Sequence, residues 1–297
     1  MKLVALAPAK VNLCLFVGPV REDRRHELVT LLESVSLADE VQLVTRVALE
    51  DQVACPGVPG PNIALRALEG LRARGWEAPR VRITIHKQIP VAAGMGGGSA
   101  DAAAMLRIAQ RLSPVPDAVI DELAAELGAD VPGQLDPRPV VATGAGEIVE
   151  PVLPPHGLAP HALLIVPAVE QLSTAAVYAE ADRLGSLRRP GELAALRDQL
   201  WTALRTAGRL PEALLVNDLQ AAALSLCPRI EAALHAARDA GAEHAFVCGS
   251  GPTVAGLYWG DDAPSRAALG AADLAHRFPR AGSAAPVPRG YGFPLFA

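Results

Sequence analysis

Apolar and polar residues alternate along several stretches of the chain, with the period of a half-buried β-strand. The clearest example is Val81–Ile89, which leads into a run of glycines. Short apolar or alternating runs predict further strands at residues 3–6, 11–17, 40–45, 140–143, 148–152, 161–166, 245–247 and 254–258. The strands on either side of residues 144–147, a glycine-bearing turn, are expected to form a hairpin.

Segments rich in helix formers separate these strands. Asn62 is a suitable N-cap for a helix over residues 64–75, and Ser173-Thr174 can cap a helix that runs through Tyr178. The other predicted helices span residues 102–112, 117–127, 193–206, 218–226, 228–240 and 264–276.

A cluster of prolines divides the chain near its middle, at residues 151, 154, 155 and 160. Because 297 residues suit two medium domains, we expect one over residues 1–152 and a second over residues 153–297. The proline- and glycine-dense segment 51–61 predicts a loop. The similar composition after residue 276 predicts a poorly ordered tail.

The composition excludes several classes of protein. Apolar residues make up 51% of the chain but aromatic residues only 4%, so alanine, leucine and valine must fill most of the core. The net charge of −5, with both signs interspersed, offers no basic surface for nucleic acid or for an anionic membrane. No apolar run reaches the roughly 18 residues that a membrane span requires.

The N-terminus and the cysteines indicate the compartment. The first residues turn polar too soon for a signal peptide. Cys14, Cys55, Cys227 and Cys248 are scattered, without metal-ligand spacing and without a C-x-x-C pair. We therefore expect a soluble cytoplasmic protein with free thiols that binds neither nucleic acid nor membrane.

The segment Pro90–Asp101 carries the strongest chemical signal. It places four glycines between the strand at 81–89 and the helix at 102–112. Glycines permit positive φ and close backbone approach, and the free N–H groups of a first helical turn attract an anion. This arrangement predicts a phosphate-binding loop. It lacks the lysine of a P-loop and the third glycine of a Rossmann fingerprint, and a tight turn without a ligand is the alternative.

Other candidate functional residues lie outside the segment Pro90–Asp101. Lys10 and Asn12 are two residues apart, so on a strand they share a face and can bind phosphate or substrate oxygens, or they are solvated edge residues. Asp130 follows a helix end and can act as a general base, bind a divalent cation or cap a loop. The charged segment 21–27 by itself predicts a solvated turn. The Gly/Ser segment 248–253 predicts either a phosphate contact or a hairpin turn.

Taken in order, these stretches resemble the GHMP kinase superfamily, from residue 3 to about residue 260. Eight segments carry the resemblance: APAKVNL (7–13), HEL (26–28), PVAAGMGGGSAD (90–101), GADVP (128–132), GAGE (144–147), ST (173–174), NDL (217–219) and GSGPT (249–253). The resemblance implies a two-domain α+β fold. Its N-terminal half would be ribosomal-S5-like and bind ATP, its C-terminal half ferredoxin-like, with ATP and substrate between them.

The resemblance also implies transfer of the ATP γ-phosphoryl group to a hydroxyl group of a cytidine-diphosphate-linked methylerythritol. Asp130 would accept the hydroxyl proton, and Lys10 would hold Asp130 and the transferring group in place. ATP would contact Asn62 and the loop residues Pro90, Val91, Ala92, Ala93, Gly94, Met95, Gly96, Gly97, Gly98, Ser99 and Ala100. The acceptor would contact Asn12, Arg25, His26, Thr174 and Tyr178.

Mg²⁺ would bridge the ATP phosphates, and no protein residue is assigned as its ligand. The partner is a small nucleotide-linked molecule, and we expect a monomer or a weak homodimer. The superfamily offers two alternatives. One is a kinase acting on mevalonate, homoserine or a sugar, against which the segment His26-Glu27-Leu28 argues. The other is a non-catalytic nucleotide-binding protein, against which the presence of both Lys10 and Asp130 argues.

The chain departs from the family pattern at two places that bear on the site. Where the family commonly reads DGYHEL, Arg24 replaces the glycine and Arg25 replaces the tyrosine that would stack on cytosine. A guanidinium is planar and can also stack on a base, so we expect Arg25 and Tyr178 on the two faces of the cytosine and His26 at its edge. At the position of the family's usual pair of serines this chain has Ser99-Ala100, as in actinobacterial members.

Overall fold

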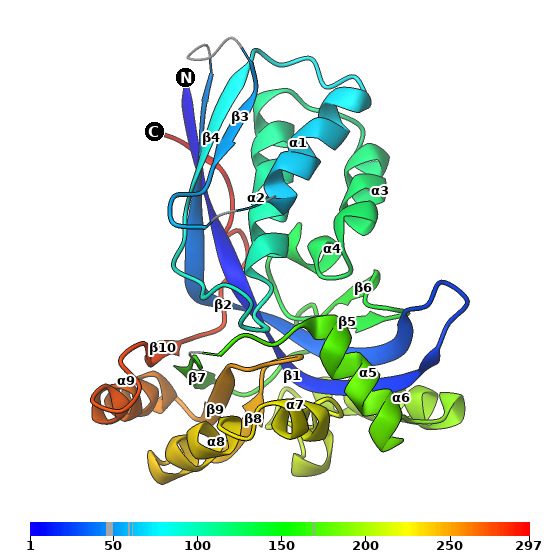
Figure 1. The fold of residues 1–297 in the computed structure, drawn as a ribbon, viewed down its shortest axis with the longest axis vertical. Helices are drawn as coiled ribbons and strands as arrows, with labels where there is room; N and C mark the ends of the chain where they lie inside the picture. The colour runs from blue at the N-terminus through cyan, green and yellow to red at the C-terminus, as the bar shows by residue number, and fades with distance from the viewer. Residues whose placement is uncertain (46–49, 59, 61, 169) are drawn as a thin grey trace.

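A computed structural model of the chain describes residues 1–45, 50–58, 60, 62–168 and 170–297. Within these residues, seven strands form one sheet and four form a second. Figure 1 shows the first sheet running from the top of the view to its lower right, and the second sheet at the lower left.

The two longest strands, β1 (Lys2–Val20) and β2 (His26–Thr45), form an antiparallel hairpin along their length. The sequence predicted a break at Pro8, and that prediction was wrong. The register shifts between Pro8 and Ala9, and such a bulge admits a residue without an N–H inside one continuous strand. The strand predicted at 40–45 is the far end of β2.

The other strands within the first sheet are β3 (Gln52–Ala54), β4 (Val81–His86), β5 (Val140–Thr143) and β6 (Ile148–Pro151). β4 pairs with the end of β2, and β3 pairs with β4 in parallel. The loop predicted around β3 therefore contains a short strand, while its Pro59 and Pro61 lie outside the described residues. β5 and β6 form the predicted hairpin, which pairs with β2.

The helices that accompany this sheet are α1 (Ile63–Ala73), α2 (Gly97–Leu112), α3 (Asp117–Leu127) and the short α4 (Val131–Gln134). The Asn62 side chain caps α1 as predicted, since its Oδ1 accepts the N–H of Ala64 at 2.8 Å. α2 packs on β1 and β2 with a face of buried alanines, whose small side chains let the helix approach closely. It begins at Gly97, five residues before the predicted start at Ala102.

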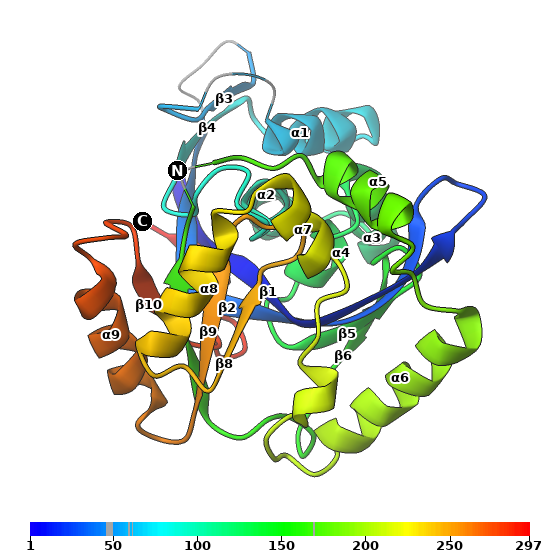
Figure 2. The ribbon, with the colours of Figure 1, turned by 60° about the horizontal axis from the view of Figure 1, so that its bottom comes forward.

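The second sheet has the order β10-β7-β9-β8 and is antiparallel, with β7 (His161–Val166), β8 (His244–Val247), β9 (Val254–Trp259) and β10 (Gly282–Ala284). Two helices pack on it, α8 (Ile230–Asp239) and α9 (Ala263–Leu274). The helices between β7 and α8 are α5 (Thr174–Leu184), α6 (Pro190–Leu204) and α7 (Gln220–Leu226). α5 packs against α7, and Figure 2 shows the two helices side by side.

The C-terminal tail is ordered, so the prediction of a poorly ordered tail was wrong. β10 pairs with β7, and β11 (Leu295–Phe296) pairs with β1 in the first sheet. The two termini consequently lie side by side (Figure 1). The tail is ordered because it completes the edges of both sheets, which a composition count cannot reveal. None of the helices described is long and apolar enough to cross a membrane.

The chain passes from the first sheet to the second between β6 and β7. This connection contains the proline cluster, but β11 returns to the first sheet from the other end of the chain. The division into residues 1–152 and 153–297 stays a prediction.

Candidate functional site

A cavity of about 990 Å³ lies between the glycine segment, the β1–β2 hairpin, α5 and the turn after β8. All the predicted site residues line it except Ala100. Ala100 is fully buried, and its N–H donates to the Gly96 carbonyl at 2.9 Å. Its N–H is therefore used within α2, and the contact of Ala100 with ATP stays a prediction.

Lys10 and Asp130 meet inside this cavity. Lys10 is 5% exposed, and its Nζ lies 3.6 Å from Asp130 Oδ2. It also donates a hydrogen bond of 2.7 Å to Asn12 Oδ1, so the two side chains share a face of β1 as predicted. Asp130 occupies the N-cap position of α4 but makes no capping hydrogen bond. Its carboxylate is therefore directed to Lys10 and not to the backbone.

Asn12 is held in one orientation by a chain of hydrogen bonds. Its Nδ2 donates to Thr30 Oγ1 at 2.8 Å, and the Thr30 hydroxyl donates to the Cys14 carbonyl at 2.6 Å. With its amide nitrogen committed to Thr30, Asn12 presents its oxygen to Lys10. Burial raises the pKa of the neighbouring Cys14 thiol to about 12, so this side chain stays neutral.

The glycine segment requires its glycines for two separate reasons. Gly94 and Gly96 both have positive φ, at +76° and +67°. A Cβ on Gly94 would lie 2.2 Å from the Cys248 carbonyl oxygen, and one on Gly96 would lie 2.8 Å from Lys10 Cγ. The segment thus packs directly on the turn after β8 and on the Lys10 side chain. The helix α2 begins at the next residue, Gly97, and its N-terminus faces the cavity.

The second Gly/Ser segment, 248–253, is a turn between β8 and β9 and also part of the cavity wall. Gly249 and Ser250 line the cavity. Ser250 Oγ and Thr174 Oγ1 are hydrogen-bonded at 3.0 Å, which joins this turn to the start of α5.

A buried ion cluster that the sequence did not reveal lies beneath the glycine segment. Lys87 Nζ pairs with Asp101 at 2.8 Å and with Asp39. Asp39 Oδ1 also accepts the N–H groups of Gln88 and Ile89, at 2.6 Å and 2.8 Å. The cluster therefore ties both ends of the segment to β2. Burial raises the pKa of Asp101 to about 7. Lys87, which is shared by the two carboxylates, opposes this shift, and the charge of Asp39 adds to it.

The opposite end of the cavity carries the residues predicted to bind the acceptor. The rings of His26 and Tyr178 are 4.8 Å apart with a tilt of 35°, and His26 Nε2 lies 2.9 Å from Asp182 Oδ1. Burial, followed by the charge of Asp130, raises the pKa of Tyr178 to about 12, so its phenol keeps its proton. Asp182 was missed by the sequence reasoning, because no motif marks it.

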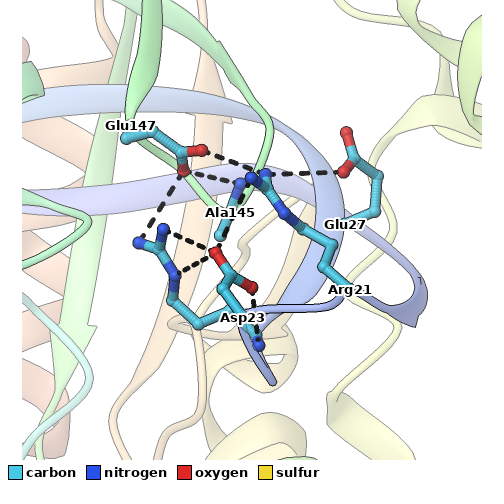
Figure 3. Close-up of polar contacts among 6 residues, drawn as sticks. Arg21, Asp23, Glu27, Ala145 and Glu147 are labelled. Atoms are coloured by element: carbon cyan, nitrogen blue, oxygen red, sulfur yellow. Dashed lines mark hydrogen bonds and ion pairs between the residues drawn. The ribbon is translucent and has the colours of Figure 1, made fainter.

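The tip of the β1–β2 hairpin is fixed by ion pairs to the loop between β5 and β6. Arg21 lies 3.0 Å from Glu147 and 3.5 Å from Glu27, and Glu147 also accepts the Ala145 N–H at 2.7 Å (Figure 3). Arg25 donates to Asp23 Oδ2 through Nε and Nη2, at 2.9 Å and 2.8 Å. The turn is solvated, as its charges predicted, but it also forms one wall of the cavity.

Family comparisons agree with this architecture. The pattern of the GHMP kinases N terminal domain matches residues 62–140, and that of the GHMP kinases C terminal domain matches residues 192–274. A 4-diphosphocytidyl-2-C-methyl-D-erythritol kinase of Anaeromyxobacter dehalogenans is 44% identical over 91% of this chain and 85% of its own. The enzyme of the same name from Kineococcus radiotolerans is 43% identical over 90% of this chain and 85% of its own.

Solved structures give the same result. The crystal structure of a 4-(cytidine 5′-diphospho)-2C-methyl-D-erythritol kinase superposes with a TM-score of 0.73 and 32% identity, covering 96% of this chain and all of the other. A homoserine kinase from Cytophaga hutchinsonii, at 21% identity, shares the fold with a TM-score of 0.65 over 99% of this chain and 96% of its own. These matches confirm the resemblance and the α+β fold expected from it. The chain belongs to the GHMP kinase family.

Proposed function

We propose that this chain is an ATP-dependent kinase that phosphorylates a hydroxyl group of 4-diphosphocytidyl-2-C-methyl-D-erythritol, a step in non-mevalonate isoprenoid precursor synthesis. The observation that carries the proposal is the Lys10–Asp130 pair, 3.6 Å apart in the cavity that also contains the glycine segment and the His26–Tyr178 pair. Two relatives that are 44% and 43% identical to this chain carry the name of that kinase.

Asp130 serves as the general base. Its carboxylate accepts the proton of the acceptor hydroxyl group as that oxygen attacks the γ-phosphorus of ATP, and ADP leaves with the electrons of the broken P–O bond. Lys10 places a positive charge beside the transferring phosphoryl group and orients the carboxylate. Its own position is fixed by Asn12 and by the hydrogen bond from its backbone N–H to the Met95 carbonyl, at 3.0 Å.

ATP occupies the end of the cavity formed by the glycine segment and Asn62. The backbone N–H groups at the start of α2 hold the phosphates, helped by the helix dipole and the Ser99 hydroxyl. Lys87 is neutralised by its two carboxylates. Its role is to keep the segment in shape.

The acceptor occupies the other end. The cytosine stacks on Tyr178, and His26, held by Asp182, reads its edge. Arg25 is bonded to Asp23 along the edge of its guanidinium group. This leaves the two flat faces of the group free, so Arg25 can take the place of the family tyrosine on the second face of the base. Thr174 and Asn12 contact the polar groups between the base and the reacting hydroxyl group.

ATP enters as its Mg²⁺ complex in this proposal. Among the residues that the structure describes, no group of three or more His, Cys, Asp or Glu side chains can hold a metal ion. Phosphate and water oxygens, which Mg²⁺ prefers, would come from the nucleotide and solvent. The ion neutralises phosphate charge. The four free cysteines support a cytoplasmic location, and the enzyme acts as a monomer or weak homodimer.

The proposal is tested by ADP release from purified protein and MgATP with a panel of alcohols. The panel contains 4-diphosphocytidyl-2-C-methyl-D-erythritol, mevalonate, homoserine and a hexose. We expect release that depends on the first compound alone. Release that depends on another alcohol would assign a different GHMP kinase activity, and no acceptor-dependent release would indicate a nucleotide-binding protein without turnover.

A further inference from the structure

Arg24 differs from the other cations that line the cavity. Lys10 has Asn12 and Asp130 as partners, Lys87 has two carboxylates, and Arg25 has Asp23 with Glu147 at 3.9 Å. Within the described part of the chain, no side chain forms a hydrogen bond or an ion pair with the Arg24 guanidinium group, although Arg24 lines the cavity.

The backbone of Arg24 has an unusual conformation. Its φ is +65°, in the left-handed region that glycine occupies readily and arginine disfavours. Three hydrogen bonds impose this conformation. The Arg24 N–H donates to the Arg21 carbonyl at 3.0 Å, the Arg21 N–H donates to the Arg25 carbonyl at 2.7 Å, and the Arg25 N–H donates to Asp23 Oδ1 at 3.0 Å. A side chain kept at a position that suits glycine, and facing a cavity, points to a role in binding.

The charges around Arg24 indicate which chemical class of ligand its side chain can bind. Arg21 and Arg25 already pair with the carboxylates of Asp23, Glu27 and Glu147 (Figure 3 shows those of Arg21). Arg24 is left with an uncompensated positive charge at the acceptor end of the cavity. The glycine segment, which holds the phosphates of ATP in the proposed function, lies at the other end. An unpaired guanidinium group binds a phosphate or a carboxylate in a bidentate manner, and the acceptor in the proposed function carries a diphosphate group.

We propose that Arg24 binds the diphosphate group of the acceptor, an inference that rests on the proposed function. The ion-paired turn presents the Arg24 side chain to the cavity. The flat faces of the neighbouring Arg25 remain available to the base. The two arginines that replace the family's glycine and tyrosine thus bind different parts of the acceptor. Arg24 binds the diphosphate group, and Arg25 stacks on the cytosine ring.

The test compares wild-type protein with Arg24→Gly and Arg24→Lys by calorimetric titration with cytidine, CMP and CDP at fixed ionic strength. Glycine suits the left-handed backbone, so Arg24→Gly should fold with unchanged or higher thermal stability. We expect its affinity for CDP to fall about 10-fold to 100-fold, with a smaller loss for CMP and little for cytidine. Arg24→Lys should recover part of the loss. Glu22→Ala, at an exposed neighbour outside the cavity, is the matched control and should change nothing.

Steady-state kinetics complete the test. Arg24→Gly should raise KM for the acceptor and leave KM for ATP unchanged. Unchanged CDP affinity would overturn the proposal, and so would an equal loss for cytidine and CDP, because that would place Arg24 on the base. If wild-type protein turns over the acceptor while Arg24→Gly binds CDP normally, the inference fails and the function stands. A wild-type protein that neither binds CDP nor phosphorylates the acceptor would overturn both.

Discussion

Among the residues that the structure describes, the Asp130 side chain pairs with Lys10 and forms no hydrogen bond that would stabilise the fold. It makes no capping hydrogen bond to α4, and its side chain is 36% exposed in the cavity, with the buried Lys10 beside it. A carboxylate in this position is free to take a proton from a bound alcohol, and the adjacent ammonium group keeps it oriented. In the proposed mechanism, the chemistry therefore depends on the Lys10–Asp130 pair.

Replacing Asp130 by asparagine keeps the shape of the side chain and removes its basicity. We expect Asp130→Asn to lower kcat by roughly 10²–10⁴ and to leave ATP affinity unchanged, because the glycine segment is untouched. Single-turnover kinetics and titration with an ATP analogue measure the two effects. The exposed Asp121 of α3, outside the cavity, provides the control Asp121→Asn. A folded Asp130→Asn protein with wild-type turnover would remove this residue from the mechanism.

Spacing along one strand made part of this site predictable. Lys10 and Asn12 share a face of β1 because side chains alternate along a strand, and the hydrogen bond between them follows. The cluster of Lys87, Asp39 and Asp101 could not be found in this way. Its members come from β2, the end of β4 and α2, and only the packing of these three elements brings them together.

The same cluster makes stability depend on pH. Asp101 has its pKa raised to about 7 in the folded protein, while an unfolded chain would have the ordinary value near 4. Between these values the folded form holds a proton that the unfolded form lacks. The contribution of this proton to the stability of the folded protein is therefore complete below about pH 4 and is lost as the pH rises through 7.

We expect Asp101→Asn to remove this contribution. Between pH 5 and pH 7 the stability of the wild type should fall relative to that of the variant by up to about 1.4 kcal/mol per pH unit. Urea denaturation at pH 5, 6, 7 and 8 measures it, with Asp121→Asn, at an exposed position on α3, as the control. Parallel stability profiles for wild type and Asp101→Asn would show that Asp101 is ionised throughout.

At the scale of elements, the proposed function requires the start of α2 to admit the phosphates of ATP. A Cβ on Gly97 would lie 3.1 Å from both Lys87 Nζ and Ile89 Cγ2. Gly97→Val should therefore displace the cluster beneath the segment and lower ATP affinity by roughly 10-fold or more. Calorimetry with an ATP analogue measures this. Gly191→Val places the same side chain near the start of α6, where nothing lies within 4 Å, and should bind normally. Unchanged affinity in Gly97→Val would place the phosphates elsewhere.

Elements were predictable where local signals are complete. α1 has a capping asparagine, and α3 ends at a glycine, so both were placed nearly to the residue. The first turn of α2 could not be predicted, because Gly97 and Gly98 have poor helix propensity. This turn is helical because it packs on the residues beneath it. The continuity of β1 through Pro8 likewise depends on a bulge that forms against β2.

At the scale of the whole molecule, one partly buried arginine joins distant parts of the chain. Arg107 of α2 donates to the carbonyl groups of Leu6 at 2.7 Å, of Gly292 at 2.9 Å, and of Gln134. These carbonyls belong to β1, the C-terminal tail and α4. Burial lowers the pKa of Arg107 to about 10, so it remains charged at neutral pH. The tail is thus anchored next to the helix that follows Asp130.

Arg107→Met should leave these three carbonyl groups without a donor. We expect it to destabilise the protein by about 2–5 kcal/mol and to release the tail, so that limited proteolysis removes residues near 292 first. Arg66→Met, on the exposed side of α1, is the control. A small change in the denaturation midpoint with an intact tail would show that Arg107 does not anchor it.

We expect phosphoryl transfer to a hydroxyl group of 4-diphosphocytidyl-2-C-methyl-D-erythritol to occur at the Lys10–Asp130 pair. Phosphorus NMR of the wild-type reaction with MgATP tests it most directly, since it identifies the new bond. We predict one new phosphomonoester signal that grows in step with ADP while the diphosphate signals of the acceptor persist, and no such signal with Asp130→Asn. Inorganic phosphate as the only new product, or an equal phosphomonoester signal from Asp130→Asn, would contradict the account.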